Sequence, residues 1–334
     1  MTSQKLALLV LVLVLLLSSS SFGLAQEKQT EGRPPGILLL AHGGKNDWNE
    51  EVDKLASTVD KILPVEVAFG MANKRSIQDA IDRLVRRGVQ EIVAVPLFVS
   101  SQSTVVTATQ YLLGLRPDAP AELAAYAKMV HDHSAHPAGE SEGPPLDPTT
   151  PVQSPVPIRM TEALDRHPLV AEVLLSRAQS ISNDPSHETV VVVAHGPVSD
   201  EENARWLADM GALVGIMRST SSFKQIECLT VRDDAPEPIR SQATAELRAV
   251  VERTAQQGNK VLVVPLLISY GGIEEGIQKR LEGLSYVMSS QALLPDDRLA
   301  HWVIRVAQGM LDSAANRDAQ QDSARTLHNG ATAR

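Results

Sequence analysis

The stretch Ile37-Leu38-Leu39-Leu40-Ala41-His42-Gly43-Gly44 decides the fold, because an apolar run ends there in Ala-His-Gly. An unbroken run of this kind, bounded by glycines, is typical of a strand buried on both faces of a parallel sheet. His42 follows the strand's carboxyl end, where open α/β sheets bind ligands. The pattern returns as Val190-Val191-Val192-Val193-Ala194-His195-Gly196. Two such strands predict a duplicated domain with one histidine at each site.

The spacing of apolar residues elsewhere predicts alternating helices and strands in both halves. In the first half we expect helices at 46–63 and 76–88, and strands at 65–70 and 91–99. A helix at 168–181 follows. The second half repeats this order with helices at 200–217, 236–257 and 273–285, strands at 226–231 and 260–268, and an apolar helix from about 299. Alternation of this kind is the signature of parallel α/β sheets.

Three pairs of matching segments support the duplication. Besides the two Ala-His-Gly runs, Ala94–Val99 matches Val263–Ile268, and the segment that begins at His167 matches the one that begins at Asp297. The distance between the second and third anchors is 73 residues in the first half and 34 in the second. The difference predicts an insertion inside the first domain. The expected organisation is a leader at 1–25, a linker at 26–35, a first domain at 36–183 with an insertion rich in His and Pro at 129–157, a second domain at 187–312 and a disordered tail at 313–334.

Composition excludes several classes of function. The 334 residues carry a net charge of -9, which argues against a nucleic-acid surface because phosphate binding needs clustered Lys and Arg. Cys228 is the single cysteine, so the chain has no intrachain disulfide and no cysteine-based metal site. An α/β hydrolase is disfavoured because no Gly-x-Ser-x-Gly motif is present.

The amino-terminal segment reads as an export signal. Lys5 precedes an apolar run of 12 residues, Leu6–Leu17, and Gly23-Leu24-Ala25 provides the small residues that a signal peptidase requires. The run is short for a membrane span, which needs about 20 residues. We therefore expect an exported protein, periplasmic or extracellular, with no stable membrane insertion after cleavage; an uncleaved membrane anchor is the alternative.

The ordered motifs resemble those of the class II chelatases of the sirohydrochlorin cobaltochelatase and ferrochelatase type, the CbiX/SirB group. The resemblance rests on Ala-His-Gly after the first strand, Val65–Phe69, the Val-Pro-Leu-Phe of the third strand and His167–Val170, and it covers about residues 36–312 as two copies. It implies an α/β fold of two tandem chelatase-like domains, each a mostly parallel four-stranded sheet flanked by helices.

The resemblance also implies a reaction. Members of this family insert Co²⁺ or Fe²⁺ into a tetrapyrrole in cobalamin or siroheme biosynthesis, with the metal as a substrate and no organic cofactor. The macrocycle loses two N–H protons and gains the metal, and a neutral imidazole both binds such a metal and accepts a proton. His42 and His195 match the family's first histidine position, and we predict that they act as metal ligand and proton acceptor. The alternative is that each histidine only caps a strand end.

The family's second histidine, in a Gly-x-His-Val pattern after the proline strand, is missing twice. Thr104 stands at its position in the first half, and the second half reads Ser269–Glu275, which looks one residue shorter. Three explanations are open. His42 and His195 share one cleft, or Glu274 and Glu275 supply the lost ligand as in protoporphyrin ferrochelatases, or catalysis has been lost. The two glutamates equally fit first-turn residues favoured by the helix dipole.

A histidine cluster in the insertion is a further candidate for metal binding. His131, His133 and His136 lie close together in sequence and can bind Ni²⁺, Co²⁺ or Zn²⁺, or else belong to a solvated loop. The sequence thus predicts a tetrapyrrole metal chelatase, a lyase, that uses His42, His195 and Glu274. The alternative from a different class is an exported binder of metal or tetrapyrrole that does not catalyse.

Overall fold

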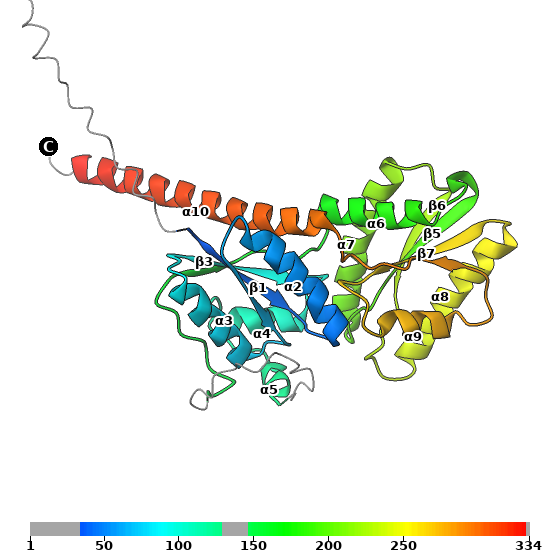
Figure 1. Cartoon of the computed structure of the whole chain (residues 1–334), viewed down its shortest axis with the longest axis horizontal. Helices are drawn as coiled ribbons and strands as arrows, with labels where there is room; N and C mark the ends of the chain where they lie inside the picture. Colours follow the sequence, from blue (N-terminus) through cyan, green and yellow to red (C-terminus); the bar gives the residue numbers. More distant parts are fainter. Residues whose placement is uncertain (1–33, 129–145, 332–334) are drawn as a thin grey trace, which may run out of the picture. The chain divides into compact units, whose positions relative to one another are not determined.

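Two parallel sheets account for the apolar runs of the sequence (Figure 1). The computed structural model describes residues 34–128 and 146–331, and the side chains of 315–319 and 321–331 are not part of that description. Within the described residues each sheet has four strands, in the orders β2-β1-β3-β4 and β6-β5-β7-β8. All pairings are parallel, so the predicted fold class is confirmed. The strands are β1 Gly36–Ala41, β2 Val65–Phe69, β3 Ile92–Leu97, β4 Ile158–Met160, β5 Glu188–Ala194, β6 Gln225–Thr230, β7 Lys260–Leu266 and β8 Val287–Met288.

The central strands are those that carry the histidines. β1 lies between β2 and β3, and Ala41 is level with Phe69 on one side and Leu97 on the other. β5 lies between β6 and β7 in the same way, with Ala194 level with Thr230 and Leu266. Each histidine therefore leaves the middle of a sheet at the carboxyl edge, as predicted.

The helices begin close to the predicted positions, except for the two at Thr104–Leu112 and Leu123–Tyr126, which the sequence analysis does not predict. They are α2 Asn46–Asp60, α3 Lys74–Arg86, α4 Thr104–Leu112, α5 Leu123–Tyr126, α6 Pro168–Ser180, α7 Asp200–Ser219, α8 Ile239–Gln256, α9 Ile273–Arg280 and α10 Asp297–Ala331, with a 3₁₀ turn at Pro185–His187. The helix expected at 273–285 ends earlier, and Gly283 adopts a left-handed φ of 83° in the turn that follows. The edge strands β4 and β8, of 3 and 2 residues, are too short for a periodic signal.

Alternate residues of each strand belong to different cores. In β1, Leu38 and Leu40 pack with α3 and α4, whereas Ile37 and Leu39 face the opposite core, as the two-residue period of a strand requires. That opposite core is continuous with one face of the second sheet, where Val190 and Val192 belong to it. A third cluster covers the other face of the second sheet. One apolar core is therefore shared by both halves.

The last helix of each half packs against the sheet of the other half. α6 follows the first sheet in sequence but packs against α7 and β7, and α10 packs against α2 and β3 (Figure 1). Trp302 of α10 is fully buried in the shared core. The sequence boundary at 183–187 therefore does not separate two independently packed domains, because each sheet needs a helix from the other half.

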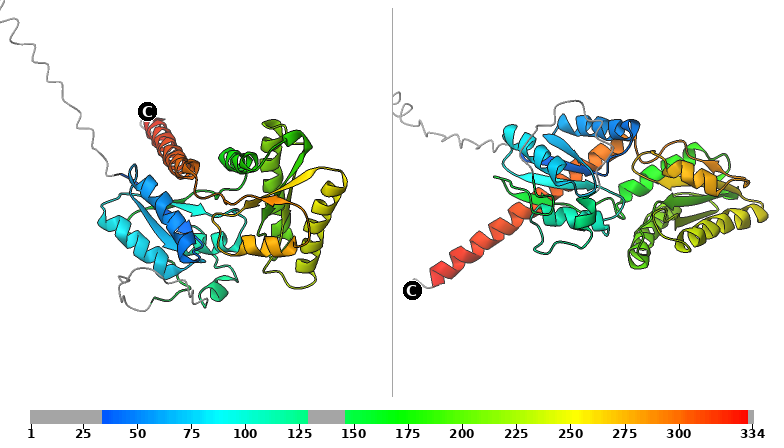
Figure 2. Two further views of the ribbon diagram at one scale, coloured as in Figure 1. Left: turned by 45° about the vertical axis from the view of Figure 1, so that its right-hand side comes forward. Right: turned by 90° about the horizontal axis from the view of Figure 1, so that it is seen from below.

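The structure differs from the predicted insertion and tail. Residues 129–145, with the three insertion histidines, lie outside the described residues, but 146–157 pack on the first sheet. Val152 donates its N–H to the carbonyl of Leu112 at 2.7 Å, and Val152 and Val156 contact the core beside α3. The tail predicted to be disordered at 313–334 continues α10 as one helix to Ala331 (Figure 2). Its alanines, glutamines and arginines favour helix, which the polar composition concealed.

Arg177 joins α6 to the loop before α10. Its guanidinium is buried and donates hydrogen bonds to the carbonyls of Ala292 at 2.8 Å, Leu293 at 3.0 Å and Pro295 at 2.7 Å. Asp296 lies 3.4 Å from it. Burial lowers the pKa of Arg177, yet a guanidinium stays charged at neutral pH. One side chain thus satisfies three backbone groups of a segment more than a hundred residues away.

We predict that Arg177→Met lowers the free energy of unfolding by about 2–4 kcal/mol, because it leaves three buried carbonyls without their donor and removes an ion-pair partner of Asp296. Urea denaturation followed by circular dichroism measures the loss. The control is Arg205→Met, which removes an exposed ion pair with Glu201 and should cost less than about 1 kcal/mol. Equal stabilities of the two variants would refute the role of Arg177.

Candidate functional site at the strand ends

The glycine after each histidine is required by the backbone. Gly43 and Gly196 have φ of 81° and 76°, in the left-handed region that glycine favours. A Cβ on Gly196 would lie 2.5 Å from Cβ of Thr230, and one on Gly43 would lie 3.5 Å from Cβ of Phe69. The His-Gly pair is thus the point where the chain turns closely past the neighbouring strand, and this turn fixes where the histidine leaves the sheet.

We predict that Gly196→Ala destabilises the protein by about 2–4 kcal/mol, through left-handed strain and a clash with Thr230. Gly258→Ala is the matched control. Gly258 has a φ of 77° and nothing within 4 Å of its would-be Cβ, so only the strain term applies, about 1–2 kcal/mol. Thermal unfolding of both variants measures the difference, and a Gly196→Ala variant no less stable than Gly258→Ala would contradict the close approach.

His42 is exposed, and one of its ring nitrogens is engaged. Its Nδ1 lies 2.7 Å from the carbonyl oxygen of Gly43. Because a carbonyl only accepts, Nδ1 is the protonated nitrogen of this contact. In the neutral ring the lone pair is then on Nε2. This is the arrangement in which an imidazole offers one nitrogen to a metal while the other is held by a carbonyl.

His195 has different surroundings. Its side chain is 29% exposed, and Nε2 lies 3.4 Å from Oδ2 of Asp234 in the loop after β6. The carbonyl of His195 accepts a hydrogen bond of 2.6 Å from the N–H of Arg232 in the same loop. The two histidines therefore hold equivalent positions in the fold but have different chemical neighbours.

A cavity of about 350 Å³ lies beside the loop that follows His42. Lys45, Asp47 and Glu51 line it from the first half. The second half contributes Glu274, Glu275 and the segments around 269–271 and 290–295. The two predicted glutamates therefore line the same cavity as Lys45, which lies three residues after His42.

Trp48 connects the two walls of this cavity. Its side chain is buried against both glycines of the site: a Cβ on Gly44 would lie 2.9 Å from Cγ of Trp48, and one on Gly271 would lie 3.2 Å from Cδ1. Larger residues at either glycine would push the indole away. The loop that carries His42 and the loop that precedes Glu274 thus meet on one aromatic ring.

The carboxylate of Glu274 is engaged by its own loop. One oxygen accepts the N–H of Gly271 at 3.0 Å and of Gly272 at 2.9 Å, so it satisfies free backbone donors at the start of α9. This supports the helix-start reading of Glu274. Glu51 is less satisfied, because Oε1 pairs with Lys54 at 2.8 Å while the buried Oε2 has no partner among the described residues.

The positions of the family's second histidine are equivalent in the two halves. α4 begins at Thr104 and α9 at Ile273, each seven residues after the end of the preceding strand at Leu97 and Leu266, so the second half is not shorter there. The hydroxyl of Thr104 lies 2.5 Å from that of Tyr126. Neither position offers a metal-binding nitrogen.

Among residues 34–128 and 146–314, no three His, Cys, Asp or Glu side chains are grouped closely enough to hold a metal ion. The described part of the chain therefore does not bring His42, His195, Glu274 and Glu275 together as one set of ligands. His131, His133 and His136 lie outside the described residues. Glu66, an acidic residue in the β2 strand, is paired with Arg83 at 2.6 Å and Arg87 at 3.1 Å, which gives it a structural role.

Sequence reasoning missed Asp234 and Glu51. Asp234 follows β6 in Arg-Asp-Asp, and an acidic residue just past a buried strand was the available signal. Glu51 lies on α2 among other charged residues and is distinguished only by burial of one oxygen. Neither the contact of Asp234 with His195 nor the burial of the Glu51 oxygen can be predicted from the local sequence.

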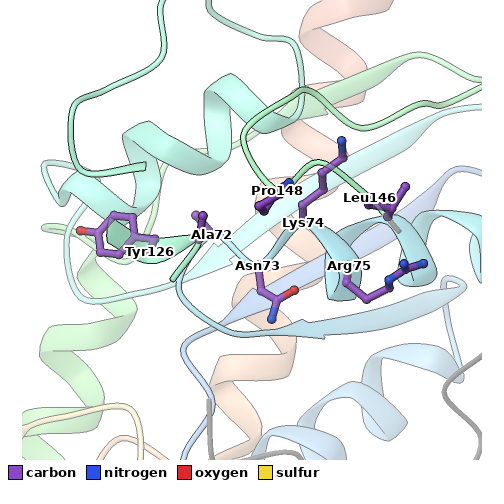
Figure 3. A pocket seen from close by; sticks show the side chains of 8 residues that line it. Ala72, Asn73, Lys74, Arg75, Tyr126, Leu146 and Pro148 are labelled. Carbon is purple, nitrogen blue, oxygen red and sulfur yellow. The ribbon is translucent and has the colours of Figure 1, made fainter. Parts of the chain in front are cut away.

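A second cavity, at the start of α3, is much smaller (Figure 3). It has a volume of about 120 Å³, below the usual range of about 300–1,000 Å³ for ligand pockets. Lys74 at its wall is buried and donates to the carbonyl of Asp147 at 2.8 Å and to the hydroxyl of Thr150 at 2.5 Å. The amine therefore ties the 146–150 segment to α3.

No helix in the described part of the chain has both the length and the apolar character of a membrane span.

Comparison with known proteins finds similarity to chelatases in sequence and in fold. Residues 36–181 match the family model CbiX. The sirohydrochlorin cobaltochelatase of Sulfolobus acidocaldarius is 38% identical over 68 residues, which are 20% of this chain and 55% of the relative. The structure of SirB from Bacillus subtilis with Fe³⁺ has a TM-score of 0.55 at 16% identity and covers 86% of this chain and 98% of SirB. SirB from Bacillus subtilis subspecies spizizenii with cobalt has a TM-score of 0.50 at 14% identity, over 82% of this chain and 94% of that one.

The fold is similar to that of the SirB chelatases, and residues 36–181 are similar to the CbiX family. The matched segment of the Sulfolobus relative belongs to a sirohydrochlorin cobaltochelatase. The aligned region spans about half the length, 55%, of the Sulfolobus relative. The solved structures, at 16% and 14% identity, bear on the fold alone.

Proposed function

We propose that this protein inserts a divalent metal, Co²⁺ or Fe²⁺, into a sirohydrochlorin-type tetrapyrrole, with His42 as the residue that meets the metal. The observation that carries the proposal is the exposed ring of His42, whose Nδ1 is held by a carbonyl. The loop that follows it leads at Lys45 into a cavity with carboxylates on its walls. A ligand nitrogen and acidic groups are what the exchange of two protons for a cation requires.

The residues around the cavity suit such a reaction. Asp47, Glu51 and Glu275 offset the charge of an incoming cation, and Glu51 has an oxygen without a partner among the described residues. Trp48 and Gly271 keep the two walls at a fixed separation. A cavity of about 350 Å³ encloses only part of a tetrapyrrole, so the macrocycle would extend out of it towards solvent.

The metal is chosen by analogy with the relatives. The curated relative is a cobaltochelatase, and the SirB structures carry iron and cobalt. Imidazole and carboxylate bind both ions, with Co²⁺ favoured over Fe²⁺ in the general order of affinities. We therefore propose Co²⁺ as the first ion to test. We also propose that the protein acts outside the cytoplasm, on the strength of the leader at residues 1–25, which lies outside the described residues.

We predict that the purified protein accelerates Co²⁺ insertion into sirohydrochlorin, followed by absorbance. His42→Ala should weaken Co²⁺ binding by about 10-fold or more and slow insertion correspondingly, because the proposed site loses the ligand nitrogen of His42. Calorimetry measures the affinity.

The matched control is His187→Ala. His187 lies at the amino-terminal end of β5, is exposed and pairs with Asp184 at 2.8 Å, so its loss should leave both quantities unchanged. Stoichiometric Co²⁺ binding without acceleration over the uncatalysed reaction would instead identify a binder that does not catalyse. This outcome is a specific possibility because Thr104 and Ile273 replace the second histidine.

A further inference from the structure

The small cavity at the start of α3 has basic walls. Lys74 and Arg75 line it from α3, Tyr126 lines it from α5, and none of the described residues around it is acidic (Figure 3). The chain as a whole carries a net charge of -9, so a cavity with only basic charges departs from its overall character. At about 120 Å³ it is too small for a whole organic ligand and suits a single polar group of one.

Lys74 brings a buried charge to this cavity. The residue is 7% exposed, and its ammonium group has three N–H donors. Two of them go to uncharged acceptors, the carbonyl of Asp147 and the hydroxyl of Thr150. The carboxylate of Asp147 accepts instead from the N–H of Thr149 at 2.9 Å and from its hydroxyl at 2.7 Å. Buried charges are normally paired, yet among the described residues Lys74 has no carboxylate partner.

The cavity lies on the loop that touches the His42 turn. The N–H of Gly70 donates to the carbonyl of Ala41, directly before His42, at 2.9 Å. A Cβ on Gly43 would lie 3.7 Å from the nitrogen of Gly70, and a Cβ on Gly70 would lie 2.7 Å from Cβ of Asn73. Asn73 is part of the cavity wall. Two close contacts therefore connect the turn after His42 with this cavity.

The larger cavity, which begins at Lys45, has the opposite charge. Four acidic residues and one basic residue lie on its walls: Asp47, Glu51, Glu274 and Glu275 against Lys45. Acidic walls attract a metal cation and repel a carboxylate. A sirohydrochlorin-type macrocycle carries acetate and propionate groups on its rim. These groups are repelled by the larger cavity and attracted by the basic one.

We propose that the cavity at the start of α3 is a subsite for one rim carboxylate of the tetrapyrrole, and that Lys74 pairs with this carboxylate. The proposal rests on the function proposed above and deepens it, because it orients the macrocycle. One carboxylate is held beside α3, and the acidic cavity is left for the metal. The carboxylate accepts the third N–H of the ammonium in a charge-assisted hydrogen bond, the stronger kind in proteins.

The test compares metal-free sirohydrochlorin with its methyl ester, whose rim is uncharged, by absorbance titration against the full chain. Lys74→Met should lower the ratio of acid affinity to ester affinity by about 10-fold, the usual worth of a hydrogen bond to a charged group. Ester binding and the Kd for Co²⁺ should change by less than about twofold, since neither involves this pair. A loss of packing alone would weaken acid and ester equally.

Two further variants separate the charge from the fold. Thr150→Val removes an acceptor of Lys74 but keeps the ammonium, so it should leave the acid-to-ester ratio unchanged. Ala127→Leu fills the cavity without touching the charge and should lower the ratio, and it decides the question if Lys74→Met does not fold. An unchanged ratio in Lys74→Met and Ala127→Leu, or an equal fall in Thr150→Val, would overturn the proposal.

Failure of the proposed function has a different signature. If the wild-type protein binds neither the acid nor the ester, that function fails, and propionate serves as the probe of the subsite. Propionate, but not chloride at the same ionic strength, should then shift the backbone ¹⁵N–¹H signals of residues 72–75. Such shifts without macrocycle binding would make this a site for free small carboxylates and overturn its assignment to the macrocycle. No shift would overturn the site itself.

Discussion

The exchange of terminal helices is the constraint on which the rest of the structure depends. α6 completes the second sheet and α10 completes the first, so one apolar core runs through both halves. Arg177 fixes the loop before α10 through three buried carbonyls. The site depends on this arrangement because residues 290–295, part of that loop, form a wall of the cavity.

Within this frame the two copies differ in the surroundings of their strand-end histidines. Both keep the His-Gly turn, because the glycine has a left-handed φ in each copy, and in the second copy it also passes close to Thr230 of the neighbouring strand. Their second histidine positions are occupied by Thr104 and Ile273, and only the second copy places a carboxylate beside its histidine. The backbone requires glycine at the turn, whereas the side chains beside each ring come from the loops around the strand ends.

The sequence predicted the fold class and most elements because buried parallel strands are long apolar runs and their helices have clear periodicity. It missed β4 and β8, which are too short for a period, and the helical tail, whose polar residues hide good helix formers. It did not predict the helix exchange, since pairing between distant faces leaves no local pattern. For the candidate site it predicted the histidines and Glu274, and their roles stay predictions. Asp234 escaped because its contact with His195 depends on how Arg232 and Asp233 anchor the loop.

The central claim, that His42 meets the metal, is tested most directly by crystallography of the full chain soaked with Co²⁺, with data collected at the cobalt absorption edge. The account predicts an anomalous peak within about 2.0–2.3 Å of Nε2 of His42, a normal bond length for first-row ions bound by imidazole. Nδ1 should remain hydrogen-bonded to the carbonyl of Gly43. A cobalt peak bound elsewhere, with the ring of His42 free of metal, would contradict the account.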